Sequence, residues 1–117
     1  MIRIGPAAAR VRVTFKGELI ADSRDALVLE EGGYPPVVYL PRRDVKMERL
    51  IRTSHTTYCL HKGHATYYTI CNGQTVRNAA WSYEQPKDEV AAIRELLAFY
   101  PDKVDISSEP GGSPSSW

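Results

Sequence analysis

Hydrophobic and polar positions alternate along much of the first forty residues, which is the period-two pattern of half-buried strands. Residues 11–15 and 18–21 show this alternation on either side of a Lys-Gly pair, and together they predict a β-hairpin. Residues 26–29 and 37–40 are aliphatic runs bounded by Gly or Pro, and they predict two further strands. Strand therefore dominates the first third of the chain.

The same pattern continues in the middle of the chain, interrupted by turn residues. Residues 56–72 are rich in Thr and Tyr around a Lys62-Gly63 pair, and residues 75–83 follow an Asn-Gly pair. Each pair predicts a hairpin turn. Residues 103–106 predict a last strand.

Two stretches instead carry apolar residues at intervals of three and four, the spacing of an amphipathic helix. Residues 44–52 predict a short helix capped by Asp44. Residues 88–98 predict a second helix, with Asp88 and Glu89 at its N-terminus, where acidic side chains are favourable.

These elements predict a mainly β fold: a small single domain of short antiparallel strands with two short helices, over residues 1–107. Residues 108–117 hold mostly Ser, Pro and Gly, and we expect them to form a flexible tail. The strands and helices do not alternate in βαβ fashion, which disfavours a doubly wound nucleotide-binding sheet.

Charge and composition narrow the function classes. The 117 residues include 15 Lys+Arg and 14 Asp+Glu, a net charge of +1. This balance cannot supply the broad positive field of a nucleic-acid-binding protein, so we expect no nucleic-acid partner. Arg3 and Arg10 interrupt the first apolar run, so we expect neither a secretory signal nor a membrane segment, and a cytoplasmic location.

All three histidines and both cysteines fall within 17 residues, from His55 to Cys71. A two-residue turn at Lys62-Gly63 would put Cys59, His61 and His64 on one face of the hairpin, a three-ligand zinc set. His55 would lie about 20 Å from His61 at ~3.3 Å per residue and cannot join them. The favoured alternative is a buried Cys59 beside an exposed turn with two histidines, so no metal is favoured and the cofactor, if any, is unknown.

In that register Cys71 would lie opposite Ser54, which argues against a disulfide with Cys59. Cys59 is also a candidate nucleophile, because Lys62 and His61 are near it in sequence. Nothing in the sequence marks a third residue that would orient the histidine, so catalysis is left open.

A ligand pocket is the remaining interpretation of this region. Aromatic and cationic side chains from adjacent predicted strands, with a turn arginine, suit a small anionic or aromatic ligand. The candidate residues are Arg42, Cys59, Lys62, Tyr67, Trp81 and Tyr83.

Four strings in the chain resemble the family catalogued as domain of unknown function 427. They are YLPRRDV (residues 39–45), TYCLHKGHATY (57–67), NAAWSYEQP (78–86) and AFY (98–100). The resemblance runs over residues 10–107, and it implies a tent-like, mostly β domain similar to methionine sulfoxide reductase B and to certain zinc-binding exchange factors. It implies no established activity. Leu60 and His61 depart from the family pattern, which has Cys-Pro followed by an aromatic residue before Lys-Gly.

Some catalogues label this family nucleotidyltransferase-like, but the sequence lacks the carboxylates such a reaction needs to hold Mg²⁺. The closest aspartate pairs, Asp22/Asp25 and Asp102/Asp105, lie in predicted turns or strand ends. Zinc-binding relatives of the implied fold use paired Cys-x-x-Cys motifs, and this chain has none.

Three hypotheses follow. The favoured one is small-molecule binding in the pocket named above, with catalysis unproven. The second is a structural module whose aromatic residues form a homo-oligomer interface. The third is the zinc site on Cys59, His61 and His64.

Overall fold

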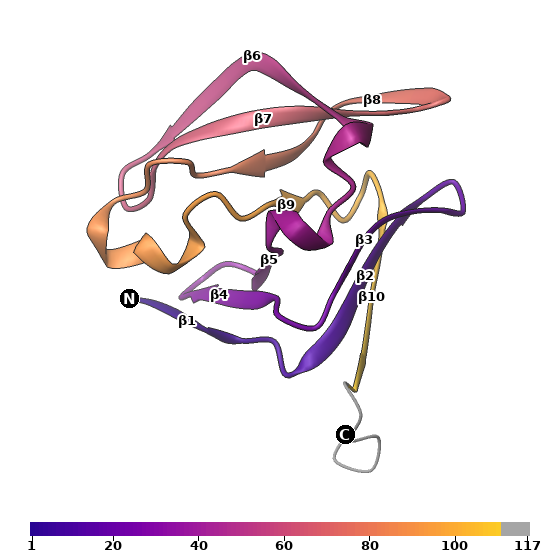
Figure 1. Ribbon diagram of the computed structural model, residues 1–117. Helices are drawn as coiled ribbons and strands as arrows, with labels where there is room; N and C mark the ends of the chain where they lie inside the picture. The colour runs from indigo at the N-terminus through magenta and orange to yellow at the C-terminus, as the bar shows by residue number, and fades with distance from the viewer. Residues whose placement is uncertain (111–117) are drawn as a thin grey trace.

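The structure is a computed structural model that describes residues 1–110 (Figure 1). It consists of strands joined by short connections and short 3-10 helices, written η. In chain order the elements are β1 (Ile2–Pro6), β2 (Ala9–Phe15), β3 (Glu18–Ser23), β4 (Leu27–Glu31), β5 (Val37–Tyr39), η1 (Arg42–Asp44), η2 (Met47–Arg49), β6 (Leu50–Cys59), β7 (Gly63–Asn72), β8 (Gln74–Ser82), η3 (Asp88–Ile93), β9 (Ala98–Phe99) and β10 (Asp105–Pro110).

The strands form three antiparallel sheets, ordered β1-β4-β5, β10-β2-β3 and β6-β7-β8-β9. Figure 1 shows the long β6-β7-β8 hairpins above the two smaller sheets, with β2, β3 and β10 running down one side. The prediction of a mainly β fold is confirmed. The strands predicted near residues 11–15, 18–21, 26–29 and 37–40 correspond to β2, β3, β4 and β5.

Two hydrophobic clusters hold the sheets together, and β7 contributes to both. Ala65 and Tyr67 belong to one cluster, whereas Tyr68 and Ile70 belong to the other. Successive side chains of a strand point to opposite faces, so each face of β7 is covered by a different part of the molecule. Because both faces are buried, β7 is a rigid support for the side chains described below.

Both predicted helices are wrong as continuous helices. Within residues 44–52 the structure has only the last residue of η1 and the single turn of η2, and β6 begins at Leu50. The backbone N–H of Lys46 donates to the carbonyl of Ile20 (2.8 Å), and Leu50 pairs with Ile70. Tertiary pairing therefore outweighs the local apolar spacing here.

The second predicted helix, residues 88–98, is shorter and broken. η3 is interrupted by a non-helical Val90 (φ −123°, ψ 27°), and Glu95 has φ 64°. The chain then becomes extended and pairs with β8 through β9. Val90, Ile93 and Leu97 are fully buried, so the apolar positions were identified correctly although the helix was not.

The C-terminal prediction also needs a correction. The last strand is Asp105–Pro110 rather than 103–106, and it pairs antiparallel with β2. Residues 108–110, expected in the tail, therefore belong to a sheet, and the rest of that tail lies outside the described residues. No helix of the described residues is long and apolar enough to cross a membrane.

Candidate functional site

The site consists of a small cavity, here called the aromatic pocket, between β7-β8 and the β4-β5 hairpin. Its volume is about 200 Å³. It is lined by residues of four strands (β4, β5, β7 and β8) and of the connections between strands: Leu29, Glu31, Tyr34, Pro35, Val37, Tyr39, Lys62, Tyr67, Trp81, Tyr83 and Tyr100.

The aromatic side chains of this pocket hold one another in place. Tyr67 on β7 pairs with Trp81 on β8, so both side chains lie on the same face of the sheet. The Trp81 ring packs 4.5 Å from the Tyr100 ring and edge-on to Tyr39 at 6.5 Å, measured between centroids. The indole Nε1–H of Trp81 donates to the Tyr39 hydroxyl (3.4 Å). The pocket wall is therefore preorganised.

One ion pair lies at the pocket. Lys62 Nζ donates to Glu31 Oε1 (2.8 Å), and the two side chains are only 12% and 18% exposed. The hydrogen bond from Lys62 is the main cause that lowers the pKa of Glu31, although burial opposes it. Burial by itself would lower the pKa of Lys62, but the hydrogen bond to Glu31 and the nearby negative groups outweigh it and raise that pKa. Both groups are therefore charged at neutral pH.

Three phenols of the pocket, those of Tyr39, Tyr83 and Tyr100, have raised pKa values and stay neutral. Burial raises the pKa of Tyr39 and of Tyr83, and burial with a hydrogen bond to Tyr67 raises the pKa of Tyr100 to about 12. The Tyr67 hydroxyl lies 3.4 Å from that of Tyr100 and 3.0 Å from that of Thr57. The pocket therefore offers aromatic faces and uncharged hydroxyls, together with one ammonium and one carboxylate.

A bulge in β6 brings His55 to the edge of this site. Arg52 pairs with Tyr68 and Thr56 pairs with Thr66, so residues 53–55 lie opposite Tyr67 alone. The His55 ring packs edge-on against the Tyr67 ring at 4.5 Å. Bulges re-aim side chains in this way and are frequent next to functional sites.

Four of the six residues proposed from the sequence for ligand binding or catalysis line the aromatic pocket: Lys62, Tyr67, Trp81 and Tyr83. Cys59 lies beside them, with its sulfur 3.6 Å from Lys62 Nζ. The sequence did not indicate Glu31, Tyr39 or Tyr100, which come from distant segments. The role of Lys62, Tyr67, Trp81 and Tyr83 as ligand contacts stays a prediction.

Arg42 lies elsewhere, contrary to its proposed place in the pocket. Its guanidinium donates to the Glu95 carbonyl (2.6 Å), to Tyr68 Oη (3.2 Å) and to Glu84 Oε2 (2.9 Å). Tyr68 also donates to Glu84 (2.6 Å). Burial would raise the pKa of Glu84, but hydrogen bonds from Tyr68 and Arg42 outweigh it and lower that pKa. This network joins η1 to the opposite face of the β7-β8 hairpin, and it is structural.

The hairpin register proposed for the zinc set is wrong. Cys59 pairs with Gly63 and Tyr58 pairs with His64, because the loop has three residues, 60–62, rather than two. Cys59 and His64 are therefore on opposite faces of the hairpin. Within residues 1–110, no three His, Cys, Asp or Glu side chains gather closely enough to hold a metal ion.

Cys71 also differs from its expected position opposite Ser54. It pairs with Thr75 on β8, at the far end of β7 from Cys59. Both cysteines are free thiols and partly exposed.

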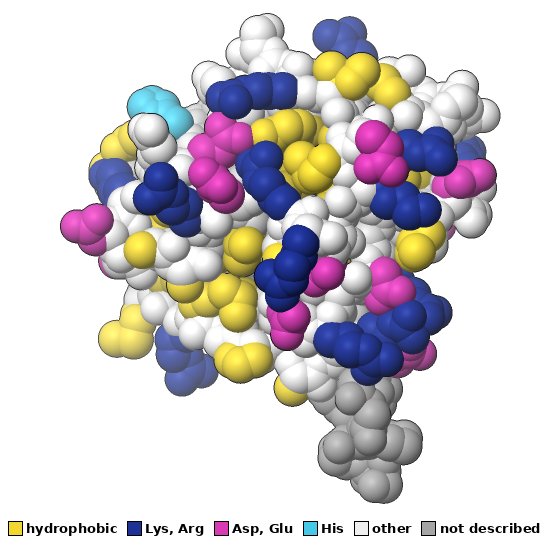
Figure 2. Space-filling model, viewed as in Figure 1, with side chains coloured by type: hydrophobic (Ala, Val, Ile, Leu, Met, Phe, Trp, Pro, Cys, Tyr) yellow, Lys and Arg dark blue, Asp and Glu magenta, His cyan; other side chains and the backbone are white. Residues whose placement is uncertain are grey.

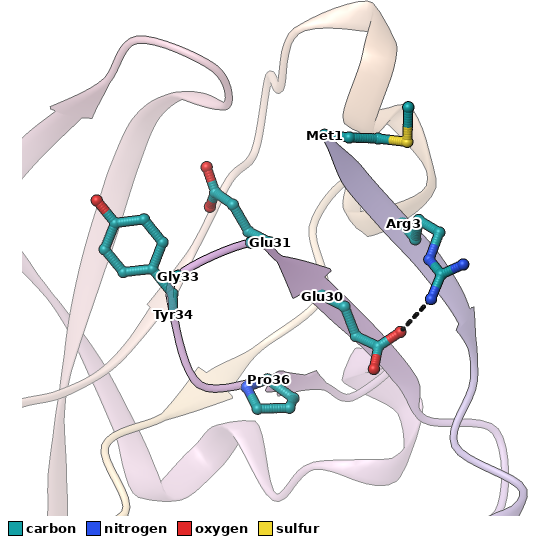
Figure 3. Close-up of a pocket in the computed structure, with 8 residues that line it drawn as sticks. Met1, Arg3, Glu30, Glu31, Gly33, Tyr34 and Pro36 are labelled. Carbon is teal, nitrogen blue, oxygen red and sulfur yellow. Dashed lines mark ion pairs between the residues drawn. The ribbon is translucent and has the colours of Figure 1, made fainter.

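A second cavity, of about 420 Å³, adjoins the aromatic pocket and shares Glu31 and Tyr34 with it (Figure 3). Figure 3 shows Glu30 turned toward Arg3, away from Tyr34 and Glu31. The Arg3–Glu30 ion pair spans 3.7 Å, and both side chains are more than half exposed. Exposed pairs of this kind contribute little to binding or stability, so the aromatic pocket is the better candidate site despite its smaller volume.

Charged side chains of both signs are interspersed on the face drawn in Figure 2. Asp22 accepts hydrogen bonds from Arg10 at 2.9 and 2.6 Å, and these are the main cause that lowers its pKa. Asp25 forms an ion pair with Arg43 (2.5 Å). This aspartate pair, one of the two weighed for a nucleotidyl-transfer metal site, is therefore occupied by structural ion pairs.

The fold and the site define a small, mainly β protein organised around one aromatic pocket with a half-buried ion pair. The comparison with family models is more specific. Residues 3–110 match the model of the family described as domain of unknown function DUF427, and the chain belongs to this family. No curated protein matches the chain.

Proposed function

We propose that this protein binds a small planar ligand in the aromatic pocket, with a ring stacked on the aromatic wall and an oxygen acceptor at Lys62. The observation that carries the proposal is the convergence of six aromatic side chains from distant segments on one cavity that also holds a half-buried lysine. A cavity with aromatic walls and a few convergent charged groups is typical of ligand-binding sites, whereas the packing of a hydrophobic core does not require one.

The cavity volume limits the size of the ligand. Sites for drug-sized ligands occupy roughly 300–1,000 Å³, whereas this pocket has about 200 Å³. A single ring with one or two substituents is the size that fits. Since Trp81, Tyr39 and Tyr100 already pack on one another, the wall loses little side-chain entropy when a ligand binds.

The ion pair sets the chemistry of the ligand. An ammonium has three N–H donors, and Lys62 uses two of them, toward Glu31 and Cys59. The third can serve a carboxylate or carbonyl oxygen of the ligand. A cationic ligand would instead compete with Lys62 for Glu31, so an anionic or neutral aromatic ligand is favoured.

The experiment uses benzoate, benzamide and benzylamine as single-ring probes of different charge, followed by NMR chemical-shift changes of the full chain. Benzoate and benzamide should shift the Trp81 indole N–H signal, and benzylamine should not. The double variant Glu31→Gln/Lys62→Met should lose benzoate binding, whereas Lys46→Met, which removes an exposed lysine, should retain it. If none of the probes shifts a pocket residue, ligand binding at this site is refuted.

The second candidate is a homo-oligomeric module, with β6 as the interface. β6 is an edge strand of its sheet, and Ile51, Tyr58 and Leu60 on it and its turn are each more than half exposed. Such an edge can pair with a second copy, although the bulge at 53–55 bends it. Measuring the mass in solution of the natural chain and of Ile51→Thr/Tyr58→Thr separates the candidates, because only an interface variant would dissociate an oligomer.

A further inference from the structure

The turn between β6 and β7 lies at the left of Figure 1. It places the Cys59 thiol next to the Lys62 amine. The backbone N–H of Lys62 donates to the Cys59 carbonyl (3.2 Å), which closes the turn. The side chain of Lys62 folds back over it, so that Nζ lies 3.6 Å from Cys59 Sγ. Glu31 holds the amine from the other side at 2.8 Å. The nitrogen and the sulfur are therefore kept together by the fold.

The other cysteine cannot reach this thiol. Cys71 lies eight residues beyond Gly63 along β7, a separation of about 26 Å at ~3.3 Å per residue. A disulfide requires Cα atoms within roughly 7 Å. If Cys59 is oxidised within one molecule, the nearest nucleophile that can trap it is therefore the amine of Lys62.

We propose that Cys59 and Lys62 form a covalent sulfur–nitrogen cross-link, a sulfenamide, when hydrogen peroxide oxidises Cys59. Cys59 is partly exposed, so a small oxidant can reach the sulfur. This inference stands on the turn geometry alone and does not depend on ligand binding in the aromatic pocket.

The reaction takes two balanced steps. In the first, the thiol is oxidised and the peroxide reduced: Cys59–SH and H₂O₂ give Cys59–SOH and water. In the second, Lys62 gives its extra proton to hydroxide in the solvent, while Glu31 stays a carboxylate that holds the side chain beside Cys59, and the free amine attacks the sulfur. The S–O bond breaks as the S–N bond forms. The amine hydrogen and the hydroxyl leave as a second water, so the product lacks two hydrogen atoms relative to the reduced chain.

The test is intact-mass analysis of the folded chain before and after treatment with peroxide. We expect a monomer lighter by two hydrogen atoms, restored to the original mass by dithiothreitol. After alkylation under denaturing conditions, only Cys71 should carry the label. Trypsin should no longer cleave after Lys62, so the peptide 53–62 should be replaced by a peptide spanning 53–77.

Matched variants separate the cross-link from other oxidation products. Cys71→Ser should show the same loss of two hydrogen atoms, whereas Cys59→Ser and Lys62→Arg should not, and unfolding the natural chain in urea before oxidation should abolish the loss. The proposal is overturned by an unchanged mass, by a gain of oxygen atoms at Cys59, by a disulfide-linked dimer, or by the same loss in Lys62→Arg.

Discussion

Replacing Lys62 with Met tests whether its ion pair with Glu31 stabilises the fold as its burial indicates. The substitution keeps most of the side-chain volume but leaves the Glu31 carboxylate without its donor in a half-buried site. Exposed ion pairs contribute at most about 1 kcal/mol, whereas removing one partner of a fully buried pair costs about 3–5 kcal/mol. With exposures of 12% and 18%, we expect Lys62→Met to lower the free energy of unfolding by about 2 kcal/mol.

Urea denaturation at pH 7 measures this loss. For a domain of this size a loss of about 2 kcal/mol moves the midpoint down by roughly 1 M. The double variant Glu31→Gln/Lys62→Met should lose less than Lys62→Met alone, because it leaves no unpaired charge. Lys46→Met, which removes an exposed lysine, should leave the midpoint unchanged.

The contribution of the Lys62–Glu31 ion pair to the free energy of unfolding should depend on pH in a direction set by the pKa of Glu31. The pKa of Glu31 is lower in the folded chain than its unfolded value of about 4.3. Its stabilising contribution is therefore complete above that value and is lost as pH falls through the lower folded value. The difference between the natural chain and Lys62→Met should be large at pH 7 and should shrink in acid. Equal losses in the single and double variants, or a difference that persists in acid, would refute the reasoning.

Three further predictions concern the frame and the phenols around the pocket. Gly63→Ala should destabilise the chain by about 1–2 kcal/mol in urea, because Gly63 has φ +106°, whereas Gly32→Ala, at an open position without positive φ, should not. Arg42→Met should cost about 1–3 kcal/mol, since it removes the hydrogen bonds to the Glu95 carbonyl, Tyr68 and Glu84, although Glu84 keeps its contacts with Tyr68 and Arg52. Arg43→Met, at an exposed pair, should cost less than about 1 kcal/mol. In an ultraviolet pH titration, Tyr100→Phe should lose a phenolate signal that develops near pH 12 in the natural chain, rather than one that develops near pH 10. Because folding raises the pKa of Tyr100, its contribution to the free energy of unfolding should be lost as the pH rises from about 10 to about 12.

The strands could be predicted from the sequence because the period-two pattern reports burial directly. β2 carries the alternation Val11, Val13 and Phe15, and these three side chains are buried while the residues between them are not. The helices could not be predicted in the same way. Apolar positions three or four apart also arise when a 3-10 turn is followed by an extended segment, as happens from η3 to β9. Only long-range strand pairing decides whether such a segment forms a continuous helix or a 3-10 turn followed by a strand.

The site was partly predictable for a related reason. Tyr67 and Trp81 are on adjacent strands of consecutive hairpins, so their proximity follows from local pairing. Tyr39 and Tyr100 reach the same cavity from the ends of β5 and β9, and no local pattern links these segments to β7. Glu31 lies 31 residues before Lys62 in the chain, and only the tertiary fold brings these two charges together.

Two irregularities beside β7 account for a further part of what the sequence did not predict, the pairing of residues far from the turn. Residues 53–55 bulge from β6 opposite Tyr67, and residues 77–79 bulge from β8 opposite Thr69. A hydrogen bond from Thr53 Oγ1 to Asn78 Oδ1 (2.7 Å) joins the two bulges, and Asn78 has φ 51°. Each bulge adds residues that strict pairing would not contain, so counting from the turn gives the wrong partner. The first bulge also turns His55 toward Tyr67 and into the surroundings of the pocket, where a regular ladder would not have placed it.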